Sequence, residues 1–332
     1  MKTEFSDRRL PAEWERHEAT WLSWPNLDGE SFEFGLDVIR ESMLEIVRAL
    51  IPGEEVWINF TLPEERMWLE AQLSEFERSR IRCFEDVAFR EPYLRDNGPT
   101  FVLENGNQDL IGVKWEFDGW GGKYPPHDLD NTTGLAMAEA AGFPIEKTGI
   151  IFEGGAIESD GAGTILVSET CFSARNPTLT KDDGERILQK HLGAKTIHWL
   201  QCPHVPGDDT DGHIDVTTRL IGLEALVVSR IPEYLEQLAD IGYRLIELPV
   251  AKSGTHNDRD IETPATYANF YIGNETVLVP VFEQSTDDEA CSILAKCFPD
   301  RTITPIAANE IIKGQGGIHC LTQTIPQRAP RS

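Results

Sequence analysis

The sequence lacks any apolar segment long enough to cross a bilayer, and it is poor in basic residues. Its longest apolar runs, at 276–282 and 223–229, are far shorter than the roughly 20 residues of a membrane-spanning helix, and residues 1–10 contain no apolar signal segment. Only 30 Lys and Arg stand against 56 Asp and Glu, a net charge of −26. A field of that sign repels phosphate backbones and anionic lipids. We therefore expect a cytoplasmic protein with neither nucleic acid nor a membrane as partner.

Cysteine pairs and long linkers are also missing. The six cysteines form no Cys-x-x-Cys motif and no dense cluster, which favours free thiols in an intracellular chain. No long stretch rich in proline, serine or glycine interrupts the sequence, so we expect residues 1–332 to form a single domain. A domain of this length makes an internal repeat the natural feature to look for.

A unit of two strands, a helix and a third strand recurs along the chain. The clearest copy occupies residues 154–201, where two alternating segments flank a Gly-Ala-Gly turn and precede a segment of helical periodicity and a further strand. Further copies are assigned to residues 98–143 and 212–250 and, more loosely, to 19–60 and 266–324. The copies share an order of elements rather than their letters, so spacing alone leaves an ordinary mixed α/β domain open.

Candidate functional residues stand where these copies begin. Asp96, Glu153, His213, Asp215 and Cys320 each lie within a few residues of glycine. In a closed ring of such units the equivalent edges point at a common centre, and glycine lets backbone crowd there without steric cost. The sequence therefore predicts that these residues, which are distant along the chain, meet in one pocket.

The residue types in that pocket indicate a chemistry. A cysteine with a histidine partner supplies a nucleophile and a general base, and a carboxylate on the far ring nitrogen fixes the tautomer. Two further aspartates facing one small pocket repel each other unless a cation lies between them. A planar guanidinium, with five N–H donors in a fork, suits such a pair. The inventory predicts a cysteine nucleophile in an anionic pocket.

Eight motifs, spread in order over almost the whole chain, carry a resemblance to one family. They are PAEWERHEATWLSWP at 11–25, RDNGPTF at 95–101, FDGWGGKYP at 117–125, FEGGAIESDGAGTIL at 152–166, NPTLT at 176–180, GDDTDGHIDV at 207–216, YANFYIGN at 267–274 and GGIHCLTQ at 316–323. In these motifs the chain resembles the agmatine deiminases and bacterial, Porphyromonas-type peptidylarginine deiminases of the guanidine-modifying pentein superfamily. The resemblance implies a five-bladed α/β propeller of ββαβ units, in agreement with the five copies.

The resemblance also implies a role for each candidate residue. Cys320 matches the nucleophile, His213 the general acid and base, and Glu153 the carboxylate that orients the histidine. Asp96 and Asp215 match the aspartates that bind the guanidinium group. The implied reaction passes through a covalent amidino-thioether on the cysteine and requires neither a metal nor another cofactor. A homodimer is a further expectation from the family.

Other residues are interpreted with less help from the motifs. Trp120, on a glycine-rich loop, is a candidate wall for the aliphatic part of a substrate or a packed core side chain, and Tyr93 is a second candidate for substrate binding. His319 is expected to point away from Cys320 in an extended segment and to be structural. The acidic segment 208–215 leaves divalent metal binding open as an alternative, although its spacing does not fit a calcium loop.

The leading hypothesis is a hydrolase that converts agmatine and water into N-carbamoylputrescine and ammonia, a step of putrescine biosynthesis. Peptidylarginine deimination, which produces citrulline, is the nearest alternative. Lys123 is the only basic residue in GWGGKYPPHD at 119–128, where a substrate carboxylate would need a cationic partner, so the decarboxylated substrate is favoured. Amidino transfer to an amine and a non-catalytic propeller that binds guanidines or polyamines remain alternatives.

Overall fold

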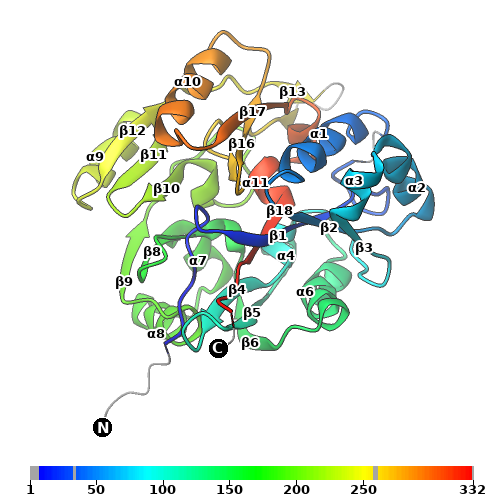
Figure 1. The fold of residues 1–332 in the computed structure, drawn as a ribbon. Helices are drawn as coiled ribbons and strands as arrows, with labels where there is room; N and C mark the ends of the chain where they lie inside the picture. The colour runs from blue at the N-terminus through cyan, green and yellow to red at the C-terminus, as the bar shows by residue number, and fades with distance from the viewer. Residues whose placement is uncertain (1–6, 33–34, 257–260, 331–332) are drawn as a thin grey trace.

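Small sheets with one repeated connection pattern form the framework of the protein. The computed structural model describes residues 7–32, 35–256 and 261–330. Within these residues, five sheets of three or four strands lie side by side around a common centre (Figure 1). In each of them two strands pair antiparallel, and a helical crossover leads to a third strand that runs parallel to the second. The ββαβ repeat predicted from the sequence is confirmed.

The strands are grouped by sheet in their spatial order. The first sheet holds β18 (Thr322–Pro326), β1 (His17–Ser23), β2 (Glu55–Asn59) and β3 (Ile81–Phe84); the second β4 (Thr100–Glu104), β5 (Asp109–Glu116) and β6 (Ile145–Ile151); the third β7 (Ile157–Ser159), β8 (Thr164–Ser168) and β9 (Thr196–Leu200); the fourth β10 (Thr218–Gly222), β11 (Ala225–Ser229) and β12 (Arg244–Leu248); the fifth β15 (Tyr271–Ile272), β16 (Thr276–Val281) and β17 (Thr302–Ala307). A separate pair consists of β13 (Thr255–His256) and β14 (Ile261–Glu262).

The helices are of two kinds, longer crossovers and short turns. The longer ones are α1 (Arg40–Leu50), α2 (Pro63–Gln72), α3 (Glu75–Ser79), α6 (Asp128–Ala141), α7 (Glu169–Arg175), α8 (Lys181–Leu192), α9 (Pro232–Ala239) and α10 (Asp287–Cys297), and the short turns are α4 (Leu94–Asn97), α5 (Gly119–Gly122), η1 (Gly154–Ala156), η2 (Ile214–Val216), η4 (Ile311–Gly314) and α11 (Ile318–Leu321). Figure 1 shows α6, α8, α9 and α10 on the periphery of the ring. Among the described residues, no helix is both long and apolar enough to span a membrane.

Burial explains where the strands and crossover helices form. The middle strands β11 and β16 are covered on both faces, so they read as nearly continuous apolar runs, ALVVS and TVLVPV. Helix α8 starts with a capping box between Thr180 and Asp183 and ends at Gly193 in the left-handed conformation. The largest apolar cluster joins the first and last sheets and reaches from Met43 to Cys320.

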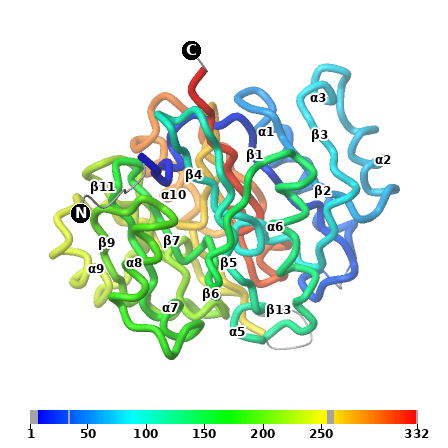
Figure 2. The backbone as a smooth tube through the Cα atoms, turned by 90° about the horizontal axis from the view of Figure 1, so that it is seen from below, coloured from blue at the N-terminus to red at the C-terminus, as the bar shows by residue number. Residues whose placement is uncertain are grey.

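The first sheet joins both ends of the chain. Strand β18 pairs antiparallel with β1, with Thr322 opposite Leu22, and the pairing can be followed in Figure 2. The prediction that residues 316–324 close the fifth copy was wrong, because this segment supplies the first strand of the first sheet. Pairing between chain ends leaves no trace in the local spacing from which the copies were assigned.

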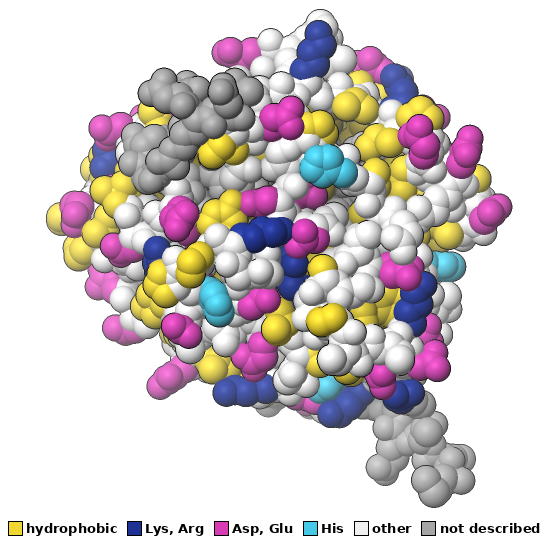
Figure 3. Space-filling view, turned by 180° about the vertical axis from the view of Figure 1, so that it is seen from behind, with side chains coloured by type: hydrophobic (Ala, Val, Ile, Leu, Met, Phe, Trp, Pro, Cys, Tyr) yellow, Lys and Arg dark blue, Asp and Glu magenta, His cyan; other side chains and the backbone are white. Residues whose placement is uncertain are grey.

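Short helical turns lead into the first strands at the centre of the ring. Turn α4 precedes β4, η1 precedes β7, η2 precedes β10 and α11 precedes β18. Turn α4 contacts both η1 and α11, and η1 contacts η2. The edges of the repeats therefore converge, as the sequence predicted. On the face drawn in Figure 3, opposite to the one seen in Figure 1, acidic side chains are scattered among basic ones.

Candidate active site

A narrow pocket of about 300 Å³ lies where the central turns meet. Its lining comprises Ser31, Tyr93, Asp96, Trp120, Tyr124, Asp209, Thr210, Gly314, Gln315, Gly316 and Cys320. Four of the seven predicted site residues, Tyr93, Asp96, Trp120 and Cys320, are thus on its wall. The other three, His213, Glu153 and Asp215, are fully buried directly behind it.

The thiol of Cys320, in turn α11, lies between a donor and an acceptor. Nδ2 of Asn269 donates to its Sγ atom at 3.4 Å, and Sγ donates to Oδ2 of Asp215 at 3.7 Å. Burial raises the pKa of Cys320 well above its usual range, and the negative charges of Asp215 and Asp96 add to the effect. This environment favours the neutral thiol and disfavours the thiolate unless a positive charge enters the pocket.

The imidazole of His213 is surrounded by carboxylates. Its Nε2 is 3.6 Å from Oε2 of Glu153, and its Nδ1 is 3.7 Å from Oδ1 of Asp96 and 3.9 Å from Oδ1 of Asp215. Burial opposes a charge on the ring, but Asp96, Cys171 and Glu153 outweigh it and raise the pKa of His213 well above its usual range. Neither ring nitrogen has a hydrogen-bond partner among the described residues, so an imidazolium here can donate to a bound molecule.

Glu153 is held by two side chains that the sequence did not single out. Its Oε1 accepts from Nε of Arg175 at 2.6 Å, and its Oε2 accepts from Sγ of Cys171 at 3.0 Å. Burial acts to raise the pKa of Glu153, yet His213 and Arg175 outweigh burial and lower it. The carboxylate is therefore ionised and faces the histidine at 3.6 Å, which is an ion-pair distance rather than a hydrogen bond.

Asp96 and Asp215 approach the pocket from different turns. Asp96 accepts from the indole Nε1 of Trp120 at 3.0 Å and from the backbone N–H of Gly155 at 3.0 Å. Burial raises the pKa of Asp96, against the opposing charge of His213. For Asp215, burial is outweighed by His319 and His213, and its pKa is lowered. Within the described structure, Oδ1 of Asp215 has no hydrogen-bond partner, so this buried oxygen is free to accept from a ligand.

Glycine at position 155 is required by the contact between η1 and the histidine. A Cβ atom there would lie 2.4 Å from Nδ1 of His213 and 3.0 Å from Oδ1 of Asp96. The first distance is shorter than real Cβ contacts and the second is unusually tight, so another residue would displace the imidazole and press on the carboxylate. The Glu-Gly-Gly motif thus carries a packing requirement as well as the carboxylate of Glu153.

Trp120 and Tyr93 form one wall of the pocket. Their rings meet edge to face at 5.7 Å, and the hydroxyl of Tyr93 donates to the carbonyl of Gly314 at 2.5 Å. Trp120 adopts a left-handed backbone conformation, with φ of 55°, that turns its ring under the loop. The sequence left a pocket wall and core packing open for Trp120; it is buried, lines the pocket and also anchors Asp96.

His319 and Asn269 are closer to the chemistry than the sequence indicated. Residues 318–321 form a helical turn rather than an extended strand, so His319 does not point away from the site, and its Nδ1 lies 2.7 Å from Oδ2 of Asp215. The expectation of an extended segment that turns His319 away from the site was wrong. Asn269 immediately precedes the fifth sheet and contacts Cys320, which is the position that the other repeats use for site residues. This equivalence was the available signal for Asn269.

The aspartates at the start of the acidic segment 208–215 are occupied by internal contacts. Asp208 accepts from Thr210, Asp209 accepts from the hydroxyl of Tyr124, and Asp211 pairs with Arg175 and Lys123. Within the described part of the chain, the potential metal ligands that lie close together are Glu153, Cys171 and His213, so His213 is the member of this segment that belongs to such a group. The structure does not bring the aspartates of the segment together as a ligand set.

A ring of ββαβ units with a cysteine, a histidine and paired aspartates at its centre is the architecture of the pentein enzymes. The family model of the Porphyromonas-type peptidyl-arginine deiminases matches residues 9–326. The chain belongs to this family.

Individual relatives agree with the assignment. A Selenomonas ruminantium protein named "Putative agmatine deiminase" is 31% identical over 360 residues, covering 96% of this chain and 95% of that protein. An agmatine deiminase of C. jejuni, solved as a cysteine-to-serine variant with substrate bound, superposes with a TM-score of 0.87 at 25% identity and covers 97% of each chain. DDAH from Pseudomonas aeruginosa, with a TM-score of 0.54 at 15% identity over 93% of this chain and 99% of that chain, shares the fold alone.

Proposed function

We propose that the protein is an agmatine deiminase, a hydrolase that converts agmatine and water into N-carbamoylputrescine and ammonia. The observation that carries the proposal is the placement of the Cys320 thiol between the carboxylates of Asp96 and Asp215 in a narrow buried pocket. The relatives named as agmatine deiminases support the same reaction. The catalytic unit proposed is the single domain 1–332, acting in the cytoplasm as a homodimer.

Binding of the guanidinium group prepares the nucleophile. A cation between Asp96 and Asp215 offsets the two negative charges that hold the thiol neutral, so the pKa of Cys320 falls when substrate arrives. The same pair of carboxylates fixes the plane of the guanidinium and aligns its carbon with the sulfur. The thiol proton passes to solvent water as the positive charge settles beside the sulfur.

Chemistry then proceeds in two halves. The Cys320 sulfur forms a bond to the guanidinium carbon, the bond from that carbon to a terminal nitrogen breaks, and His213 gives its proton to the departing ammonia. Water next attacks the amidino-thioether and one of its protons passes to His213. The hydroxyl proton of the resulting adduct then passes to solvent as the carbon–sulfur bond breaks, which releases the ureido product and the thiolate. The ionised Glu153 stabilises the imidazolium at the start and end of this cycle.

Charge at the mouth of the pocket favours agmatine over arginine derivatives. Within the described part of the chain, no lysine or arginine lines the pocket, whereas Asp209 does. Lys123 is turned to the carboxylate of Asp211, at 2.8 Å, and to the backbone carbonyl of Asp209. A substrate carboxylate would therefore face an acidic group without a cationic partner, while the amine of agmatine suits Asp209.

The test is ammonia release from agmatine, from a peptide with a C-terminal arginine and from free arginine, with a metal chelator present. We expect turnover of agmatine alone, lost in Cys320→Ser and retained in Cys297→Ser, which removes a thiol outside the site. Asp209→Asn should raise KM for agmatine more than it lowers kcat. Turnover of the peptide instead would assign protein deimination to the same residues. Binding of agmatine without ammonia release would support the non-catalytic alternative and contradict the proposal.

A further inference from the structure

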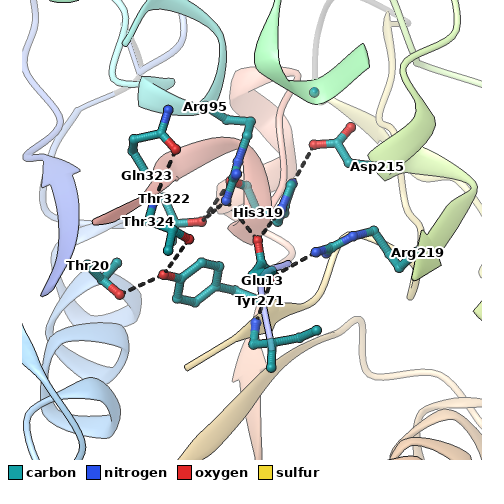
Figure 4. A network of polar contacts seen from close by, with 12 residues as sticks. Glu13, Thr20, Arg95, Asp215, Arg219, Tyr271, His319, Thr322, Gln323 and Thr324 are labelled. Carbon is teal, nitrogen blue, oxygen red and sulfur yellow. Dashed lines mark hydrogen bonds and ion pairs between the residues drawn. The ribbon is translucent and has the colours of Figure 1, made fainter. Parts of the chain in front are cut away.

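His319 lies between two buried carboxylates, those of Asp215 and Glu13, and we call this arrangement of three side chains the clamp. Its Nδ1 lies 2.7 Å from Oδ2 of Asp215, and its Nε2 lies 2.8 Å from Oε2 of Glu13, as Figure 4 shows. Ionised carboxylates only accept hydrogen bonds, so both ring nitrogens must donate for both contacts to form. The geometry therefore calls for an imidazolium that links the active site to Glu13.

Glu13 is itself rigidly held. Its Oε1 accepts from Nη2 of Arg219 at 2.7 Å and from the backbone N–H of Ile272 at 2.9 Å, and its Oε2 lies 3.0 Å from Nη2 of Arg95. Burial acts to raise the pKa of Glu13, but Arg219, His319 and Arg95 outweigh it and keep the pKa well below the usual range. Glu13 thus provides a fixed, ionised anchor for the far side of the imidazole ring.

The clamp decides which oxygen of Asp215 can meet a substrate. Oδ2 is engaged by His319, whereas Oδ1 has no hydrogen-bond partner among the described residues and lies 3.9 Å from Nδ1 of His213. If Oδ2 were released, the carboxylate could rotate toward His213 and shorten this long ion pair into a direct hydrogen bond. An Asp215 turned in that way would no longer present a free oxygen to a guanidinium.

We propose that His319, anchored by Glu13, is a positioning residue that holds the Asp215 carboxylate with Oδ1 turned to the substrate guanidinium. The inference rests on the proposed function, because it concerns the same site. Nothing in the sequence motifs assigns this role, since His319 is expected there to face away from the cysteine. The role is distinct from proton transfer to substrate, because the two ring nitrogens of His319 are engaged by Asp215 and Glu13, so the ring acts on the pocket through Asp215.

The clamp predicts a change in acid sensitivity. The titratable and charged groups that act on Asp215 are His319, His213, Cys320, Asp96 and Arg219. Removal of the His319 cation leaves the burial of Asp215 less opposed, so the pKa of this carboxylate rises. Guanidinium binding requires the ionised form, and the acid limb of kcat/KM should therefore move to higher pH.

Two isosteric substitutions separate the halves of the clamp. The amide of His319→Asn falls near Nδ1 and keeps a donor for Asp215, while the amide of His319→Gln falls near Nε2 and reaches Glu13 instead. Loss of a charge-assisted hydrogen bond predicts that His319→Gln lowers kcat/KM for agmatine by at least about tenfold and shifts the acid limb upward. His319→Asn should retain more activity than His319→Gln.

A readout independent of turnover keeps the inference separate from the proposed function. Guanidinium ion should protect Cys320 from iodoacetamide, and the dissociation constant from this protection should weaken at least about tenfold in His319→Gln. His17→Asn is the matched control, because His17 is equally buried, contacts Glu54 and the backbone of Glu13, and lies outside the pocket. It should lower Tm without changing the acid limb or guanidinium protection.

Different results would overturn the role of His319 and the proposed substrate. Equal effects of Asn and Gln at position 319, with protection and acid limb as in the wild type, would reduce His319 to a structural residue and overturn the inference. An inactive wild type that still shows guanidinium protection weakened by His319→Gln would overturn the proposed substrate and keep the clamp. If the His319 variants do not fold, Glu13→Gln should give the same shifts with smaller size, and unchanged protection in that folded variant would contradict the role.

Discussion

Removal of the Asp215 charge should make the Cys320 thiol more reactive while it destroys catalysis. Oδ2 of Asp215 lies 3.7 Å from Sγ of Cys320, and its charge is one cause of the raised thiol pKa. At an effective dielectric constant of about 20, a unit charge at that distance contributes about 4.5 kcal/mol, or about three pKa units. Relaxation of the site reduces this figure, so we expect Asp215→Asn to lower the pKa of Cys320 by at least about one unit.

The assay is the rate of carboxamidomethylation of Cys320 as a function of pH, followed by mass spectrometry of the peptide that contains it. The midpoint of the profile should move to lower pH in Asp215→Asn, while ammonia release from agmatine falls at least about a hundredfold because the guanidinium loses half of its binding pair. Asp130→Asn is the control, since this buried carboxylate accepts from the backbone of Arg90 and Glu91 and does not line the pocket. A midpoint that stays in place or moves upward in Asp215→Asn would refute the electrostatic account of the thiol.

Two further predictions concern the supports of the site, and a third concerns a buried carboxylate outside it. Arg175→Met leaves a buried carboxylate without its ion-pair partner and should lower the free energy of unfolding by about 3–5 kcal/mol in urea titrations, whereas a loss below about 1 kcal/mol would contradict the pairing. Gly155→Ala places a Cβ atom 2.4 Å from the catalytic imidazole and should reduce kcat at least about tenfold, while Gly222→Ala, which meets nothing within 4 Å, should leave kcat unchanged. Burial raises the pKa of Asp130 to about 6, so the folded state binds its proton more tightly than the unfolded chain and wild-type stability falls as pH rises through 6. Asp130→Asn should therefore raise Tm at neutral pH and gain less as pH is lowered toward the unfolded value; a gain that grows on acidification would show the opposite sign.

Much of the site could be predicted from the sequence because it follows the repeat. Asp96, Glu153, Asp215 and Cys320 lie in or directly before the turns that lead into first strands, so one structural position recurs in several copies. The motifs mark this position by their glycines. The close approach of Gly155 to His213 shows why glycine is needed there. Applied to the fifth copy, the rule that site residues precede first strands identifies the segment before β15. That segment contains Asn269, which contacts Cys320.

The rest of the site depends on side chains that reach across the ring. Glu13 comes from the segment before β1, and Arg175 comes from the end of α7, and each meets its partner only after the sheets have packed. No spacing along the chain indicates such contacts. The pairing of β18 with β1 is hidden for the same reason, because the two strands lie at opposite ends of the sequence.

The arrangement resolves an apparent conflict between an acidic pocket and a thiolate mechanism. Together with burial, Asp96 and Asp215 raise the pKa of Cys320, and in the proposed mechanism the same two charges attract the cationic substrate. A guanidinium between them adds one positive charge beside the sulfur. Asp215→Asn changes the net local charge by the same amount, because it removes one negative charge. The substituted enzyme therefore reproduces the electrostatic effect of substrate arrival without the substrate's alignment. Since the thiol of the wild type becomes a good nucleophile only when a planar cation occupies the carboxylate pair, recognition of the guanidinium and activation of Cys320 are one electrostatic event.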